Sequence, residues 1–184
     1  MEEKKINELI KKHDEYRHES INLIPSENVM KKDALLALSS DLATRYGTEW
    51  YGGSEYAGRI YEKATNLAKK LFNVRYAIIN PISGNICDLA ALFSFTKPYD
   101  EIAVIPKENG GYPFGYKKFH RKKYSIPMKE YEVNVEHLVP KKFPLILLAQ
   151  STIFFPLPIN KIKENFDGIC IYDASHVLGL IAGK

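Results

Sequence analysis

Gly168-Ile-Cys-Ile-Tyr-Asp-Ala-Ser-His176 is the stretch from which the fold of this chain can be read. Its first half is apolar and carries two β-branched isoleucines, a composition typical of a central strand that is buried on both faces. The strand would end at Asp173, and open α/β sheets bind ligands at the carboxyl ends of their strands. An aspartate there can hold a positive group such as a pyridinium nitrogen. Asp173 could equally be the N-cap residue of a following helix.

Upstream of this stretch, strand-like and helix-like segments alternate. Short apolar runs at 76–80, 101–105 and 145–149 predict further strands, and apolar periodicity predicts helices over 86–95 and 159–166. Such alternation is typical of a mostly parallel sheet with helices on both faces. We therefore expect an α/β fold.

Four loops would follow the strand ends and converge at one edge of this sheet. Ser83-Gly84 precedes a helix, where free amides and the helix dipole attract a phosphate. Gly110-Gly111-Tyr112 brings an aromatic ring, Gln150-Ser151 a hydroxyl, and Asp173 to His176 an acid. This set suits an aromatic ring cofactor with a phosphate arm. The absence of Gly-x-Gly-x-x-Gly and Walker patterns argues against a nucleotide.

The N-terminal third has a different pattern. An amphipathic helix with a narrow apolar stripe is predicted over 3–18, a strand over 20–24 and a helix over 29–42. Residues 43–56 are rich in aromatics and glycine and show no period, which favours a loop lining a pocket or interface over a packed surface loop. A clear amphipathic helix follows over 57–72.

The composition of the chain limits the classes of protein to which it can belong. The 184 residues are 45% hydrophobic and 26% charged with a net charge of +4, which is ordinary for a globular protein and too mild to indicate nucleic-acid binding. Cys87 and Cys170 are interpreted as buried thiols of a reducing compartment. No signal peptide or membrane span is apparent, so we expect a cytoplasmic protein. We also expect no metal site. The basic segment 114–124 is interpreted as a solvated helix face, with a phosphate-polymer patch as the alternative.

Four motifs stand out along the chain: Ile24-Pro-Ser-Glu-Asn28, Tyr51-Gly-Gly-Ser-Glu-Tyr56, Pro81-Ile-Ser-Gly-Asn85 and Asp173-Ala-Ser-His-Val-Leu-Gly-Leu180. Together they resemble the N-terminal part of a serine hydroxymethyltransferase, a pyridoxal-phosphate enzyme of fold type I. The similarity runs over nearly the whole chain, and Asn109-Gly-Gly-Tyr-Pro113 looks more like the archaeal branch. The resemblance implies a fold-type I architecture, with a helical arm over 1–45 and the first part of the cofactor-binding domain over 46–184.

The resemblance also implies a pyridoxal 5'-phosphate site. Ser83, Gly84 and Asn85 would bind the phosphate, Asp173 would pair with the pyridine nitrogen, and Ser151 and His176 would contact the 3-hydroxyl side. Tyr112 stands where many members have a histidine that stacks on the ring, so a ring is retained but a titratable group is lost.

A substrate side is implied by the same resemblance. Ser26 would contact the substrate carboxylate, and Tyr46 and Tyr51 would line the substrate, partly from a neighbouring subunit. Glu49, in a loop shorter than the family pattern, is taken as the acid–base glutamate; Tyr46 and His176 complete the catalytic set. The reaction implied is the interconversion of serine and glycine, with one carbon passed to a folate-like or methanopterin-like carrier.

One departure from the family pattern matters most. The Schiff-base lysine of the family lies in a Thr-His-Lys segment downstream of the Asp-x-x-His motif, and this chain stops at Lys184, before it. We therefore expect a truncated product, a fragment or one piece of a split enzyme, working as a homodimer or with a complementing C-terminal half. The alternatives are a non-catalytic protein that binds pyridoxal phosphate or a partner, and a threonine-aldolase-like lyase.

Overall fold

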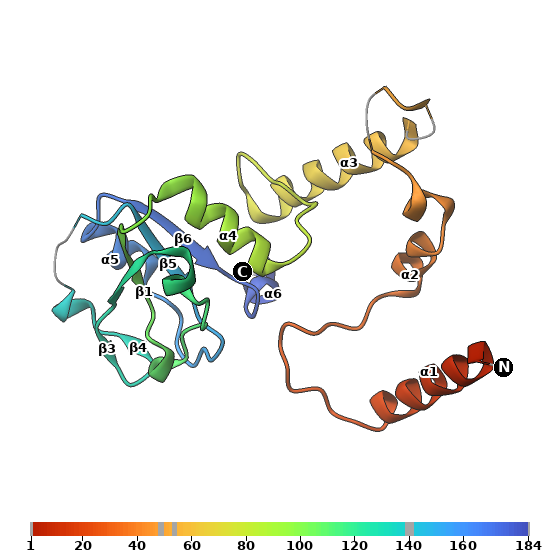
Figure 1. Ribbon diagram of the computed structural model, residues 1–184, viewed down its shortest axis with the longest axis horizontal. Coiled ribbons are helices and arrows are strands. Elements are labelled where there is room, and N and C mark those ends of the chain that lie inside the picture. The colour runs from red at the N-terminus through yellow and green to blue at the C-terminus, as the bar shows by residue number, and fades with distance from the viewer. Residues whose placement is uncertain (1, 48–49, 53–54, 139–141, 184) are drawn as a thin grey trace. The chain divides into compact units, whose positions relative to one another are not determined.

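The computed structural model describes residues 2–47, 50–52, 55–138 and 142–183. The chain forms two compact units, Met1–Ile60 and Tyr61–Lys184, and each is described by itself. Figure 1 shows the ribbon with its elements labelled.

A four-stranded parallel sheet organises the second unit. Its strands are β1 (Glu101–Val104), β2 (Lys122–Ser125), β5 (Leu145–Ala149) and β6 (Ile169–Asp173). They lie in the order β2-β1-β5-β6, and every neighbouring pair is parallel. The register places Ala149 beside Asp173, so the ends of β5 and β6 lie side by side. This confirms the predicted α/β class and its mostly parallel sheet.

Helices cover both faces of this sheet (Figure 1). Alternate residues of the strands point to opposite faces. On one face Ile146 and Leu148 pack with Ile162 of α5 (Ile159–Glu164). On the other, Leu145 and Leu147 pack with Leu92 of α4 (Gly84–Phe95). All five residues of β5 are buried, as expected of a central strand between two helical layers.

The remaining elements of the second unit are short. The chain also forms β3 (Met128–Lys129) and β4 (Glu132–Val133), an antiparallel pair, and α6 (Leu178–Gly183). Its 3-10 turns are η3 (Lys107–Asn109), η4 (Tyr116–Phe119) and η5 (Val135–His137).

The first unit contains α1 (Glu2–His18), α2 (Lys32–Leu38) and the 3-10 turn η1 (Asp41–Thr44). The helix α3 (Glu55–Phe72) begins in this unit and ends in the second. None of the residues from 4 to 60 whose side chains are described is buried. Large apolar side chains such as Ile21 and Leu23 are 90% and 86% exposed.

Two predicted strands are absent from the described structure. Residues 76–80 follow α3 without pairing to the sheet, and an unpaired strand leaves its backbone groups without ladder partners. In the segment 20–24, the Asn22 side chain accepts a hydrogen bond from the Ile24 amide at 2.9 Å, a local turn that competes with extended pairing. The predicted helix over 29–42 is shorter, because Ser39 and Ser40 bond back to carbonyls of the preceding turn.

The basic segment was wrongly interpreted as one solvated helix. It forms η4 and then β2, separated by His120 in the left-handed region with φ 55°. Arg121 is only 6% exposed, and its guanidinium donates to the Thr96 hydroxyl and carbonyl and to the Phe119 carbonyl. The interpretation of two buried thiols is also wrong, since Cys87 is exposed and Cys170 half-buried.

Candidate functional site

The loop before α4 forms the first wall of the site. Ser83 caps the helix, and its hydroxyl accepts a hydrogen bond from the Ile86 amide at 3.3 Å. The first amides of a helix have no partner within it, so this twelve-residue helix presents free N–H groups and the positive end of its dipole. Gly84 and Asn85 are exposed at this end. The arrangement can bind an anion such as a phosphate.

The glycine-rich loop after β1 is the second wall, and close backbone contacts fix it. A Cβ on Gly111 would lie 2.0 Å from the Ile105 carbonyl oxygen, so only glycine fits there. Gly110 adopts φ +82°, which also favours glycine. Tyr112 is then held at both ends: its amide donates to the Ala149 carbonyl at 3.0 Å, and its hydroxyl donates to Asn85 Oδ1 at 2.7 Å.

The third loop follows β5 and joins the second. The Ser151 amide donates to the Gly110 carbonyl at 2.7 Å, and Gln150 pairs with Gly111 in an isolated bridge. Gln150 is buried and donates through Nε2 to the Asn109 carbonyl at 3.1 Å. These bonds leave the Ser151 side chain exposed at the strand end.

Asp173 ends β6 and forms the fourth part of the site. Its Oδ1 accepts hydrogen bonds from the amide and the hydroxyl of Ser175 at 2.9 and 2.5 Å. Among the described residues, nothing donates to its other carboxylate oxygen, Oδ2. His176 is half-buried, and its buried Nδ1 has no partner in the part of the chain that is described. A Cβ on Gly84 would lie 3.3 Å from Ser175 Oγ, so the fourth loop touches the first.

A hollow of about 310 Å³ lies between α4 and the end of β6. Gly84, Asp88, Asp173 and Ser175 are among its lining residues. Asp88 is 4% exposed, and its Oδ2 has no hydrogen-bond partner among the described residues. Burial, and secondarily the negative charge of Asp173, raise the pKa of Asp88 to about 6.

Sequence reasoning missed Asp88. The available signal was a carboxylate in an otherwise apolar helix, one turn after the Ser83-Gly84 junction that was already singled out. A charged residue on a buried helix face is rare without a reason.

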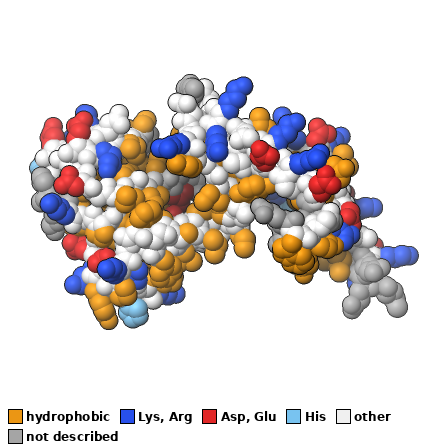
Figure 2. All heavy atoms as spheres, turned by 90° about the horizontal axis from the view of Figure 1, so that it is seen from above, with side chains coloured by type: hydrophobic (Ala, Val, Ile, Leu, Met, Phe, Trp, Pro, Cys, Tyr) orange, Lys and Arg blue, Asp and Glu red, His pale blue; other side chains and the backbone are white. Residues whose placement is uncertain are grey.

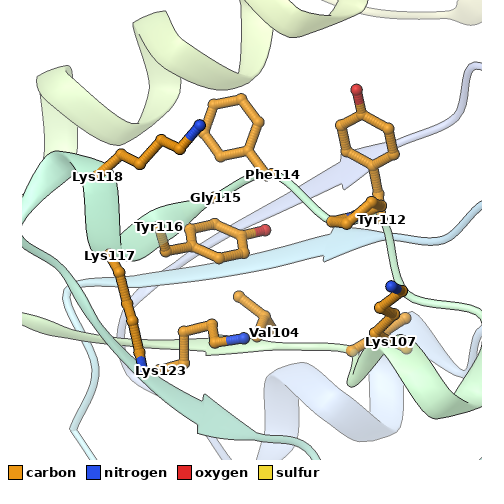
Figure 3. A pocket seen from close by; sticks show the side chains of 11 residues that line it. Val104, Lys107, Tyr112, Phe114, Gly115, Tyr116, Lys117, Lys118 and Lys123 are labelled. Carbon is orange, nitrogen blue, oxygen red and sulfur yellow. The ribbon is translucent and has the colours of Figure 1, made fainter.

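A second hollow of about 310 Å³ lies beyond Tyr112, around the glycine-rich loop and η4 (Figure 3). Aromatic rings of Tyr112, Phe114 and Tyr116 line it together with four lysines: Lys107, Lys117, Lys118 and Lys123. Burial is the largest of the causes that raise the pKa of Tyr116. The lining residues of this hollow include no acid, so it favours anions.

The candidate substrate residues belong to the first unit. Ser26 is exposed, and Tyr46 is 77% exposed. The rings of Tyr46 and Tyr51 contact edge to face, with centroids 6.3 Å apart. Glu49 lies outside the described residues. The structure therefore brings together the predicted cofactor residues, from Ser83 to His176, within the second unit.

Comparison with known proteins identifies the family. The family model for serine hydroxymethyltransferase matches residues 1–184. A serine hydroxymethyltransferase of Methanobrevibacter smithii is 34% identical over 95% of this chain, which covers 46% of that protein. Those of Picrophilus torridus and Archaeoglobus fulgidus are 30% and 34% identical, over 97% and 96% of the chain and 46% and 45% of their own lengths. The chain thus spans about half the length of these curated relatives. Among the described residues, no helix is long and apolar enough to cross a membrane.

Proposed function

Because this chain belongs to the serine hydroxymethyltransferase family, we propose that it forms the cofactor-binding part of an enzyme that interconverts serine and glycine. One observation carries the proposal. Three loops that follow strands of a parallel sheet meet the loop before α4, with a helix N-terminus on one side and Asp173 on the other. That edge is where open α/β sheets bind ligands.

The residues present fit pyridoxal phosphate, the cofactor of this family. The hollow is bounded by a helix N-terminus for an anion and by Asp173 for a cation. Four buried polar side-chain atoms have no partner among the described residues, and three of them belong to α4 or to the loops of the site: Asp88 Oδ2, Gln150 Oε1 and His176 Nδ1. Buried polar atoms in native proteins normally have partners, so their presence here supports a polar ligand.

Each residue then has a definite task. Ser83, Gly84 and Asn85 would hold the phosphate, and Asp173 would keep the ring nitrogen protonated, while Ser151 and His176 would face the 3-hydroxyl. When bound, the protonated ring supplies an electron sink for a substrate bond that breaks at the α-carbon. Tyr112 is held by its hydrogen bond to Asn85 at the phosphate side, which orients its ring for stacking.

The substrate side is a separate part of the proposal. Ser26 would bind the carboxylate of serine or glycine, and Tyr46 and Tyr51 would line the amino acid, with Glu49 exchanging a proton with it. A folate-like or methanopterin-like pterin would accept the one-carbon unit. The family's Schiff-base lysine has no counterpart among these 184 residues, so in the working enzyme another segment or chain must supply it.

A partner surface is available for that contribution. In the second unit Ile82, Phe93 and Leu180 are 92%, 57% and 77% exposed. Figure 2 shows hydrophobic side chains, in orange, at many places on the surface in that view. Large apolar side chains that stay exposed favour a contact with another segment or chain. We place here the contact with a second copy or with a complementing C-terminal half.

Cofactor binding tests the proposal directly. Pyridoxal phosphate should bind the chain saturably, followed by its visible absorbance, and Asp173→Ala should weaken binding at least about tenfold because a charged contact is lost. Asp167→Ala, at an exposed acid in the same unit, is the matched control and should bind like the wild type. Equal binding by both variants would refute the assignment of Asp173.

Serine–glycine exchange tests the reaction. The chain mixed with a C-terminal half from an archaeal relative should convert serine to glycine in the presence of a pterin carrier. Borohydride reduction followed by peptide mapping should place the cofactor on a lysine of the added half. A specific adduct on a lysine of this chain would contradict the proposed division of labour.

A further inference from the structure

Asp88 is a buried carboxyl group for which the proposed reaction gives no task. It lies in the first half of α4, whose other residues are uncharged, and is 4% exposed. Within the described part of the chain, its Oδ2 accepts no hydrogen bond, although the atom is buried. Leaving a buried acid without a partner is destabilising, and an asparagine would avoid burying a charge. Such a residue invites a functional explanation.

The surroundings of Asp88 contain negative or neutral groups. Asp173, at the end of β6, lines the same hollow, and α4 packs directly against β6. Tyr116 of η4 interacts electrostatically with both acids, and Cys87 and Tyr172 are the other titratable residues that line the hollow. No lysine or arginine is among the described residues that line this hollow. A cation brought into the hollow would therefore meet two acids and, among the described lining residues, no lysine or arginine.

We propose that Asp88 is a positioning residue that acts through Asp173: in mildly acidic solution it holds a proton while the hollow is empty, and it releases this proton to solvent when a cationic ring nitrogen lies on Asp173. The O–H bond of the Asp88 carboxyl group breaks, the proton leaves through the hollow, and no other bond changes. This inference rests on the proposed function, because it takes the pyridinium ring as the cation.

Electrostatics gives the direction of the coupling. Burial and the charge of Asp173 both favour the neutral form of Asp88. A cation bound beside the Asp173 carboxylate offsets its negative charge, so the pKa of Asp88 falls on binding. Binding then prefers the ionised acid, and the affinity for the cation rises with pH as Asp88 ionises around pH 6.

The pH dependence separates this role from a purely structural one. Below pH 5 the wild-type acid is neutral and resembles asparagine, so Asp88→Asn should leave the affinity unchanged. Above pH 7 the wild-type acid is ionised and attracts the cation, so the variant should bind about fivefold more weakly. Damage to the fold of the hollow would instead lower the affinity at both pH values.

The experiment uses pyridoxamine 5'-phosphate as the probe, since it has the ring and the phosphate but no aldehyde to react with lysines. Calorimetry of the full chain at pH 5 and pH 7.5 compares the wild type, Asp88→Asn and the exposed control Asp167→Asn. The probe's own ionisations are the same in all three titrations, so the ratio of affinities isolates the protein groups. A further titration at pH 6, carried out in two buffers of different ionisation enthalpy, measures proton release.

The inference would be supported if the dissociation constant of Asp88→Asn divided by that of the wild type is near one at pH 5 and near five at pH 7.5. Proton release on binding should also be smaller for Asp88→Asn than for the wild type. A ratio that is the same at both pH values would overturn it while leaving the proposed cofactor site intact. No binding of the probe by any variant would overturn the cofactor site and this inference together.

A second measurement covers the case in which Asp88→Asn does not fold. Carbon NMR of the aspartate carboxyl groups follows the titration of Asp88 in the wild type and in Asp173→Asn. The inference requires that Asp88 titrate at a lower pH in Asp173→Asn, because a neighbouring negative charge has been removed. An unchanged titration would overturn the coupling between the two acids.

Discussion

The two units of this molecule use apolar residues in opposite ways. In the second unit the strands β1 and β5 bury every apolar side chain that they carry, between α4 on one face and α5 on the other. In the first unit, the helices and the chain between them bury none of the side chains that are described. Amphipathic patterning is thus sufficient for a helix, whereas a core also requires a second layer to pack against.

The largest expected effect on stability comes from a substitution in the core. Leu147→Ala removes a side chain that is fully buried between β5 and α4, whereas Leu23→Ala removes one that is 86% exposed. The first should lower the free energy of unfolding by about 2–5 kcal/mol, and the second by less than about 0.5 kcal/mol. Urea denaturation followed by circular dichroism measures both. Similar losses would mean that the first unit has a core of its own.

Arg121 and Arg59 extend the comparison to charged side chains. Arg121 is buried against Thr96 and the ring of Phe93, whereas Arg59 of α3 is exposed and paired with Glu55. Arg121→Met leaves two carbonyl groups and a hydroxyl without their donor, and should cost about 2–3 kcal/mol of stability. Arg59→Met should change stability by less than about 0.5 kcal/mol. A loss at Arg59 equal to that at Arg121 would contradict the assigned burial.

Asp88→Asn is expected to stabilise the second unit. Burial raises the pKa of Asp88 from 3.8 to about 6, so the folded chain binds this proton more tightly than the unfolded chain between those values. Wild-type stability is therefore lost as pH rises through this window, and the variant escapes that loss. At pH 7.5 the variant should gain on the order of 2 kcal/mol, and below pH 3.5 it should gain nothing.

Thermal melts across this pH range measure the difference. Asp33→Asn, at an exposed acid of α2 in the first unit, is the control and should follow the wild type throughout. A gain at pH 7.5 together with weaker binding of a cationic ring would mean that stability was exchanged for function at this position. A constant gain at every pH would show that the charge of Asp88 is not its cause.

The smallest expected effect concerns a single hydroxyl group. Tyr112→Phe removes the hydrogen bond to Asn85 and should lower stability by about 1 kcal/mol or less. Tyr46→Phe in the first unit keeps the ring contact with Tyr51 and should have no measurable effect. Urea denaturation midpoints of the two variants measure both effects. A larger loss of stability for Tyr46→Phe than for Tyr112→Phe would show that the Tyr46 hydroxyl has a structural role.

Much of the second unit could be predicted from local patterns. The apolar runs over 101–105, 145–149 and 168–173 became strands because each is flanked by the partners that a parallel ladder needs. The run over 76–80 has the same character but no neighbour in the described sheet, so the same pattern gave no strand. Strand formation depends on pairing across the chain, which a local pattern does not contain.

The candidate site was predictable to a similar degree. Tyr112, Ser151 and Asp173 follow strands of the sheet, so their convergence followed from the topology rule for parallel sheets. Ser83 lies beside them through packing of α4, because the strand predicted before it is absent from the described sheet. Asp88 and Arg121 were missed because charge is usually a sign of exposure, and only packing reveals the exceptions. The roles of the site residues remain predictions that the binding experiments test.

The sequence by itself determined the family of this chain, its α/β class and the residues at the strand ends, because periodicity and motif spacing are local properties. Only the tertiary structure decided which acids share a hollow, which arginine is buried and how the four loops contact one another. Those features arise from contacts between residues far apart in the chain. Their energies depend on burial, which no single stretch of sequence specifies.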